Sequence, residues 1–117
     1  MRTEGILVGG WLPGHGRLTS LPGALLVGLP GPDGRLRYVG AVGTGWSDTE
    51  RTTLAALLDT VASDTCPFTE RPAVAGARWV VPRLVGEVRY ATRTEAGRLR
   101  HPSWHRLRPD LAPDGVS

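Results

Sequence analysis

Residues 36–61 read LRYVGAVGTGWSDTERTTLAALLDTV and join an expected strand to the one clear helix of the chain. Ser47 and Glu50 have the S-x-x-E spacing of a capping box, in which the serine hydroxyl accepts a helix amide and the glutamate reaches back to the cap amide. Leu54, Leu57 and Leu58 then recur at helical spacing and give one apolar stripe. This pattern predicts a helix that begins after Ser47.

Short apolar runs bounded by glycine and proline lie on both sides of this helix and predict strands. The expected strands cover residues 4–12, 23–29, 36–42, 79–92 and 99–107. Asp33-Gly34 is typical of a hairpin turn between the second and third strands. Pro102 interrupts the last strand, which favours an edge position for it.

Three strands, one helix and two further strands are the order of a small Greek-key barrel. We therefore expect an all-β fold with one helix, a five-stranded OB-fold barrel in which the helix lies between strands 3 and 4. An SH3-like barrel is the nearest alternative. The barrel is expected to span residues 1–110, and residues 111–117 are expected to form a flexible tail.

The composition limits the class of protein. A chain of 117 residues fits one domain, and its net charge of +3 favours an anionic partner. Cys66 is the single cysteine, so no disulfide can form within the chain, which suits a reducing cytoplasm. No apolar run approaches the ~20 residues that a membrane span needs, so no membrane partner is expected.

Positive charge gathers in the second half of the sequence. Eight of the 14 arginines lie between Arg78 and Arg108, where the only acidic residues are Glu87 and Glu95. Such a stretch can follow a phosphate backbone, although a solvated basic surface is the plainer alternative. The candidates for phosphate contacts are Arg83, Arg89, Arg93 and Arg100, with Arg98 and Arg106 as weaker ones and Thr44 as a hydroxyl between two glycine amides.

The other motifs give little support for a metal site or a phosphate loop. His101 and His105 have the spacing of metal ligands on a helix, but Pro102 argues against a helix and no cysteine or acidic cluster adds ligands. No metal site is therefore expected. The glycines of residues 40–45 are not followed by the Lys-Ser/Thr of a phosphate loop, so we interpret them as residues that permit a sharp turn. Tryptophans such as Trp79 are interpreted as core.

Several longer segments carry a family resemblance: LVGGW at 7–11, LRYVGAVGTGW at 36–46, CPF at 66–68, WVVPRLVGEV at 79–88 and LRHPSW at 99–104. Together they resemble the C-terminal domain of bacterial ATP-dependent DNA ligases of the non-homologous end-joining, ligase D type. The resemblance covers residues 4–110. It implies an OB fold that binds duplex DNA opposite a nucleotidyltransferase domain, so that the two domains clamp a nick during DNA repair.

The end of the resemblance falls on the last nucleotidyltransferase motif, R-x-D-K. Here Arg108 and Asp110 fit the motif, and Leu111 stands where the family has lysine. The resemblance implies that these residues help to orient the pyrophosphate of ATP, a role that loses one charge with Leu111. ATP and Mg²⁺ are implied for the catalytic partner domain, and no cofactor is expected on this chain alone. Relatives commonly have tryptophan where this chain has Arg93.

All 14 basic residues are arginine, so the chain has no lysine. Ligation in this family proceeds through a covalent lysyl–AMP, which needs an amine nucleophile. We therefore expect no ligation by this chain alone, and a separate nucleotidyltransferase domain must supply the lysine. The chain could be a separately encoded domain, an excised part of a longer protein, or a remnant paralogue.

Three interpretations remain open from the sequence. The first is a ligase OB domain that clamps nicked or intact double-stranded DNA with a nucleotidyltransferase domain, in trans or in a parent polypeptide. The second is a stand-alone nucleic-acid-binding OB module without a catalytic role. The third is a remnant that no longer binds DNA.

Overall fold

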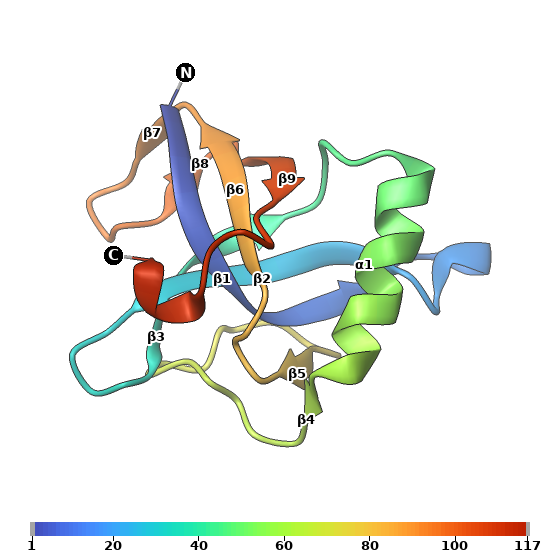
Figure 1. The fold of residues 1–117 in the computed structure, drawn as a ribbon, viewed down its shortest axis with the longest axis horizontal. Helices are drawn as coiled ribbons and strands as arrows, with labels where there is room; N and C mark the ends of the chain where they lie inside the picture. The colour runs from blue at the N-terminus through green and yellow to red at the C-terminus, as the bar shows by residue number, and fades with distance from the viewer. Residues whose placement is uncertain (1, 117) are drawn as a thin grey trace.

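The computed structural model describes residues 2–116 and shows a curved antiparallel sheet with one helix beside it (Figure 1). Strands β1 (Arg2–Pro13), β2 (Pro22–Pro30) and β3 (Leu36–Val42) follow one another as neighbours. The third strand matches its predicted bounds, and the first two extend one or two residues beyond theirs. The turn between β2 and β3 forms as predicted, with Gly34 at a φ of 79°.

The remaining strands close the sheet into a barrel. β6 (Val85–Tyr90) pairs with the first half of β1 and, on its other side, with β9 (Ser103–Leu107). The Trp104 amide in β9 donates a hydrogen bond to the Thr44 carbonyl just past β3, at 2.8 Å. The neighbour order β1–β2–β3–β9–β6–β1 is that of an OB fold, as predicted.

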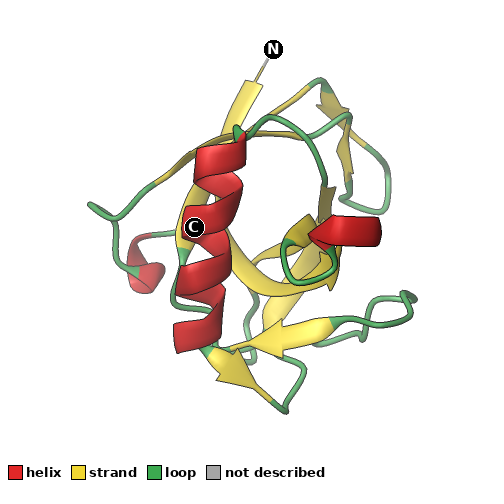
Figure 2. Cartoon of the chain, turned by 90° about the vertical axis from the view of Figure 1, so that its right-hand side faces the viewer, coloured by secondary structure: helices red, strands yellow, loops and turns green. Residues whose placement is uncertain are grey.

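The helix lies between the third and fourth barrel strands, again as predicted. α1 (Asp48–Thr60) packs along one side of the curved sheet (Figure 2) and buries Leu54 and Leu58. The capping box is confirmed: the Glu50 amide donates to the Ser47 hydroxyl at 3.1 Å, and the Ser47 amide donates to the Glu50 carboxylate at 3.0 Å.

The long strand predicted over residues 79–92 is wrong as one continuous element. It divides into β5 (Arg78–Val80), β6 and the short β7 (Thr92–Arg93). β5 pairs with Gly10 and Trp11, whereas β6 pairs with residues 2–7 of β1, and β1 has a register shift between Val8 and Gly10. Because β1 is irregular there, one straight partner strand cannot follow it. β4 (Ala62–Ser63) pairs with β5 on the outer side.

The last predicted strand is also divided, at Pro102 as the sequence indicated. β8 (Leu99–Arg100) pairs with β7 in a separate two-stranded sheet, and β9 pairs with β6. Between them His101 has a φ of 53°, in the left-handed region, which turns the chain from one sheet to the other. β9 is only partly an edge strand, because the bond from Trp104 to Thr44 occupies its other side.

One apolar core fills the barrel, and among the described residues no polar or charged side chain is buried in it. Phe68 is 1% exposed and packs edge-to-face against Tyr38 and Trp79. Two short 3-10 turns, η1 (Gly16–Leu18) and η2 (Pro113–Gly115), complete the elements.

The C-terminal residues contact the barrel. Leu111 packs against the core and Val116 is buried in it. The division of the chain at residue 110 and the flexibility of the segment after it stay predictions. None of the helices in residues 2–116 is both long and apolar enough to cross a membrane.

Candidate nucleic-acid interface

Three of the predicted phosphate contacts, Arg89, Arg93 and Arg100, lie on β6, β7 and β8, and Thr44 lies in the turn after β3. We call these four residues the arginine strip. Arg89 lies opposite Ser103 on β9, and the next residue of β9 contacts Thr44 through the barrel-closing hydrogen bond. Arg93 and Arg100 lie on the paired strands β7 and β8. The Ala91 amide donates to the Arg100 carbonyl at 3.0 Å, which ties this hairpin to the end of β6.

The arginines of the strip differ in whether their charge is already paired within the protein. The side chains of Arg89 and Arg100 are exposed, and neither has an ion pair or hydrogen bond within residues 2–116. Arg93 instead forms an ion pair with Glu4, and its guanidinium lies 5.8 Å from the centre of the Tyr90 ring. Arg89 and Arg100 therefore offer charge to a phosphate directly, whereas Arg93 would first have to leave Glu4.

The turn that carries Thr44 is shaped by a glycine. Gly45 has a φ of 105°, and a Cβ on it would lie 2.3 Å from the Trp104 carbonyl oxygen. The turn interpretation is thus confirmed for Gly45, because only glycine combines this conformation with so close an approach. The exposed Thr44 is held beside β9, and its role in binding phosphate stays a prediction.

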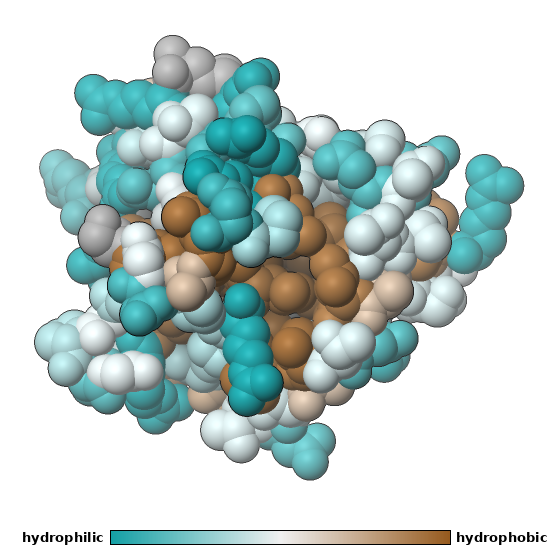
Figure 3. Space-filling view, in the orientation of Figure 1, coloured by the Kyte–Doolittle hydropathy of each residue, from teal (hydrophilic) through white to brown (hydrophobic). Residues whose placement is uncertain are grey.

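Arg83 lies apart from the arginine strip, in the loop between β5 and β6. It lines a small pocket of about 170 Å³ together with Arg108 and Leu111. A second small pocket, of about 120 Å³, continues along α1 and shares Leu107 with the first. Figure 3 shows this region as an apolar hollow beside the helix.

Arg108 is the centre of an ion-pair cluster. Its Nε and Nη2 donate to the two carboxylate oxygens of Asp110 at 2.9 and 2.7 Å, and its Nη1 donates to Glu87 Oε2 at 3.0 Å. His105 and Arg106 lie 3.5 and 3.4 Å from the other oxygen of Glu87. The hydrogen bonds from Arg108 lower the pKa of Asp110 to about 2, and the same bonds raise the pKa of Arg108.

Arg108 therefore does not present an empty phosphate-binding edge in this arrangement. The bidentate contact with Asp110 uses the edge of the guanidinium that could otherwise receive a phosphate. Leu111 stands where the motif has lysine. Its side chain lines the small apolar pocket that Arg83 and Arg108 also line. A phosphate at this edge of Arg108 would have to displace the Asp110 carboxylate.

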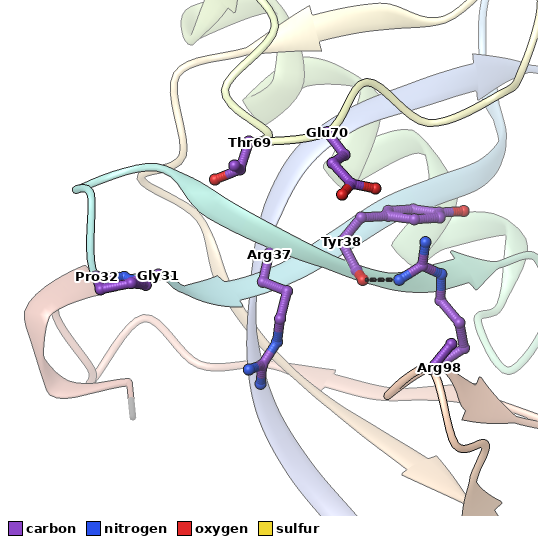
Figure 4. A pocket seen from close by; sticks show the side chains of 8 residues that line it. Gly31, Pro32, Arg37, Tyr38, Thr69, Glu70 and Arg98 are labelled. Atoms are coloured by element: carbon purple, nitrogen blue, oxygen red, sulfur yellow. Dashed lines mark hydrogen bonds between the residues drawn. The ribbon is translucent and has the colours of Figure 1, made fainter.

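A larger pocket lies beside β3. Its volume is about 360 Å³, and it lies between the β2–β3 turn, residues 69–70 and the β7–β8 turn. Arg37, Tyr38 and Arg98 line it (Figure 4). The sequence made Arg98 only a weak candidate and missed Arg37, although Arg37 occupies an exposed position within an apolar strand.

The three aromatic side chains of the arginine-rich stretch are too buried to stack on bases. Trp79 and Trp104 are 8% and 3% exposed, which confirms the interpretation of these tryptophans as core, and Tyr90 is 6% exposed. Within residues 2–116 no group of three or more His, Cys, Asp and Glu side chains could hold a metal ion. Backbone phosphates are therefore the part of a nucleic acid that this surface can best contact.

Comparison with known proteins gives the family. The family model of the ATP dependent DNA ligase C terminal region matches residues 19–111. The multifunctional non-homologous end joining protein LigD of Mycolicibacterium smegmatis is 46% identical over 97% of this chain, and the LigD of Pseudomonas aeruginosa is 35% identical over 94%. The chain spans only 15% and 14% of these relatives.

Solved structures agree with the sequence relatives. The ligase domain of Mycobacterium tuberculosis LigD is 44% identical and superposes with a TM-score of 0.93, covering 99% of this chain and 38% of that one. A mycobacterial DNA ligase D complexed with ATP and MES is 42% identical, with a TM-score of 0.87, and covers 99% of this chain and 37% of that one. The chain therefore belongs to the family of C-terminal regions of ATP-dependent DNA ligases, and its OB fold is the fold of that region.

Proposed function

We propose that this protein is the DNA-binding OB domain of a ligase D-type enzyme in non-homologous end joining, and that it clamps nicked duplex DNA together with a nucleotidyltransferase domain. The observation that carries the proposal is the match of 99% of this chain to 38% of a ligase domain. The other 62% of that ligase domain lies outside the match and would correspond to the catalytic part. By analogy with its bacterial relatives, we place the protein in the cytoplasm.

The arginine strip is the proposed DNA contact. Arg89 on β6 and Arg100 on β8 carry unpaired charge, and Thr44 adds a hydroxyl in the turn next to β9. Contacts of this kind neutralise phosphates without reading bases, so we expect binding without sequence preference. Arg83 lies near Arg108 and would contact a different part of the DNA or the catalytic domain.

The chemistry of ligation belongs to the partner domain. The chain has no lysine, so the nucleophile for AMP must come from the nucleotidyltransferase domain, which would also bind ATP and Mg²⁺. The contribution of this chain to ATP would be made by Arg108. For that, its Asp110 contact has to open, because the carboxylate and a phosphate compete for the same guanidinium edge.

A stand-alone DNA-binding module is the second candidate. It is favoured by the pairing of Arg108 with both Glu87 and Asp110 and by the direction of Leu111 into an apolar pocket. In that case the chain would bind DNA with no effect on any adenylation step.

The experiment is fluorescence anisotropy of the chain with nicked duplex, intact duplex and single-stranded DNA, across a salt series. The proposal predicts saturable duplex binding, a preference for the nick, and a log-linear loss of affinity with salt. The double variant Arg89→Glu/Arg100→Glu should abolish most of this binding, whereas Arg17→Glu, an exposed arginine in η1, should weaken it only through net charge. A preference for single strands would favour the second candidate, and no binding at low salt would refute both.

A further inference from the structure

The pocket between β3 and the β7–β8 turn has the features of a small anion site. Arg37 and Tyr38 of β3 form one part of its wall, and Arg98 forms another. In the view of Figure 4, Thr69 and Glu70 lie across the pocket from the two arginines. The residues that line the pocket therefore carry two positive charges and one negative charge.

Arg98 is held in place before any ligand binds. Its Nη1 donates to the Tyr38 carbonyl at 2.7 Å, and its guanidinium lies 4.8 Å from the centre of the Tyr38 ring. The turn that carries it is closed by a hydrogen bond from the Arg98 amide to the Thr94 hydroxyl at 3.1 Å. Fixing an arginine in advance lowers the entropy cost of binding, and its remaining N–H groups are available as donors.

Arg37 supplies the second charge. Its side chain is exposed, and within residues 2–116 it has no ion pair and no hydrogen bond. Thr69 is less available, because its hydroxyl already contacts the Asp33 carboxylate at 3.1 Å. The lining of the pocket thus combines a guanidinium held by the Tyr38 carbonyl with an unpaired one, and each can donate hydrogen bonds to a phosphate oxygen.

The pocket lies close in the chain to Arg100 of the arginine strip, because Arg98 lines it. Arg98 and Arg100 flank Leu99, and the Leu99 carbonyl lies 4.0 Å from the place of a Cβ on Gly40 of β3. The strand that carries Arg100 therefore lies against the strand that carries Arg37. Phosphates are spaced regularly along a nucleic-acid backbone. A backbone that follows the arginine strip past Arg100 would therefore bring its next phosphates to the pocket.

We propose that the pocket formed by Arg37, Tyr38 and Arg98 binds a backbone phosphate of the DNA, as a subsite that extends the arginine strip. This inference rests on the proposed function, since it needs the chain to bind DNA. The shared chemistry is phosphate, so a free pyrophosphate or nucleotide is the other source that the experiment must distinguish.

The test measures DNA affinity and its salt dependence for single variants of the full chain. Arg37→Gln should reduce the slope of log affinity against log salt by about 0.9, so that the loss between 50 and 200 mM salt shrinks by about 3.5-fold. Glu70→Gln should raise affinity several-fold, because it removes a like charge from the opposite wall. Arg17→Gln carries the same charge change as Arg37→Gln outside the pocket and should keep the wild-type slope.

Two further measurements complete the test. Arg98→Gln should also lower the slope, with circular dichroism to confirm that the variant is folded. Pyrophosphate titrated against the DNA complex should compete only weakly. Wild-type slopes for both Arg37→Gln and Arg98→Gln would overturn the inference while leaving DNA binding intact. Pyrophosphate that saturates the pocket, with DNA affinity unaffected by Arg37→Gln, would overturn it too. Failure of the wild-type chain to bind DNA would instead refute the proposed function.

Discussion

Replacing Gly86 with alanine should lower the free energy of unfolding by about 2 kcal/mol. A Cβ on Gly86 would lie 2.3 and 2.6 Å from Cη2 and Cζ3 of Trp104, so the indole has to move by about 1 Å or more to reach ordinary contact. Trp104 is 3% exposed, and its amide closes the barrel at Thr44, so it has little room to move. Overpacking of this size costs about 3 kcal/mol, offset by up to ~1 kcal/mol because alanine is less flexible than glycine in a strand.

Urea unfolding measures this effect. With an m-value of about 1.5 kcal/mol/M, the midpoint should fall by roughly 1.3 M. Gly5→Ala is the matched control, because Gly5 pairs with Glu87 across the same two strands and no atom lies within 4 Å of its added Cβ. That variant should keep or slightly raise the midpoint. Equal midpoints for Gly86→Ala and Gly5→Ala would refute the argument from close packing.

The remaining predictions concern the helix, the acid limb of stability and the C-terminal motif. Ser47→Ala should lower stability by about 1 kcal/mol through loss of the cap, while Thr49→Ala should change it by less than ~0.5 kcal/mol, as measured by thermal unfolding. The pKa of Asp110 is held at about 2 by Arg108, so its contribution to stability is present above the ordinary value of 3.8 and is lost as pH falls through about 2. The stability difference between wild type and Asp110→Asn should therefore shrink from pH 4 to pH 2, and a constant difference would contradict this. Leu111→Lys should lower stability by about 1 kcal/mol in urea, because the lysine stem must leave or bend out of the apolar pocket, and it should leave DNA affinity within about twofold.

The features that the sequence could predict depend on residues close together in the chain. The capping box, the Asp33-Gly34 turn and the third strand are of this kind, and each forms as expected. The order of strands and helix then limits the topology to few choices, of which the OB fold is one. The break at Pro102 is likewise a local effect, since proline lacks the amide that a strand needs.

Non-local pairing explains what the sequence could not predict. The division of residues 79–92 follows from the irregularity of β1, which is distant in sequence. Arg93 pairs with the distant Glu4, and Arg108 pairs with the distant Glu87 as well as with its neighbour Asp110, so the availability of each charge depends on the fold. The pocket at Arg37 and Arg98 is built from three separate segments, and no single motif marks it.

The central claim is that this chain supplies the OB function to a lysine-bearing catalytic domain. The most direct test uses a ligase D nucleotidyltransferase domain that lacks its own C-terminal region. Its rate of nick sealing is measured with Mg²⁺ and ATP, in the presence and in the absence of this chain. We predict that added chain increases the sealing rate and that the Arg89→Glu/Arg100→Glu variant does not. An unchanged rate, under conditions where the chain still binds nicked duplex, would contradict the claim and leave a DNA-binding module without a catalytic role.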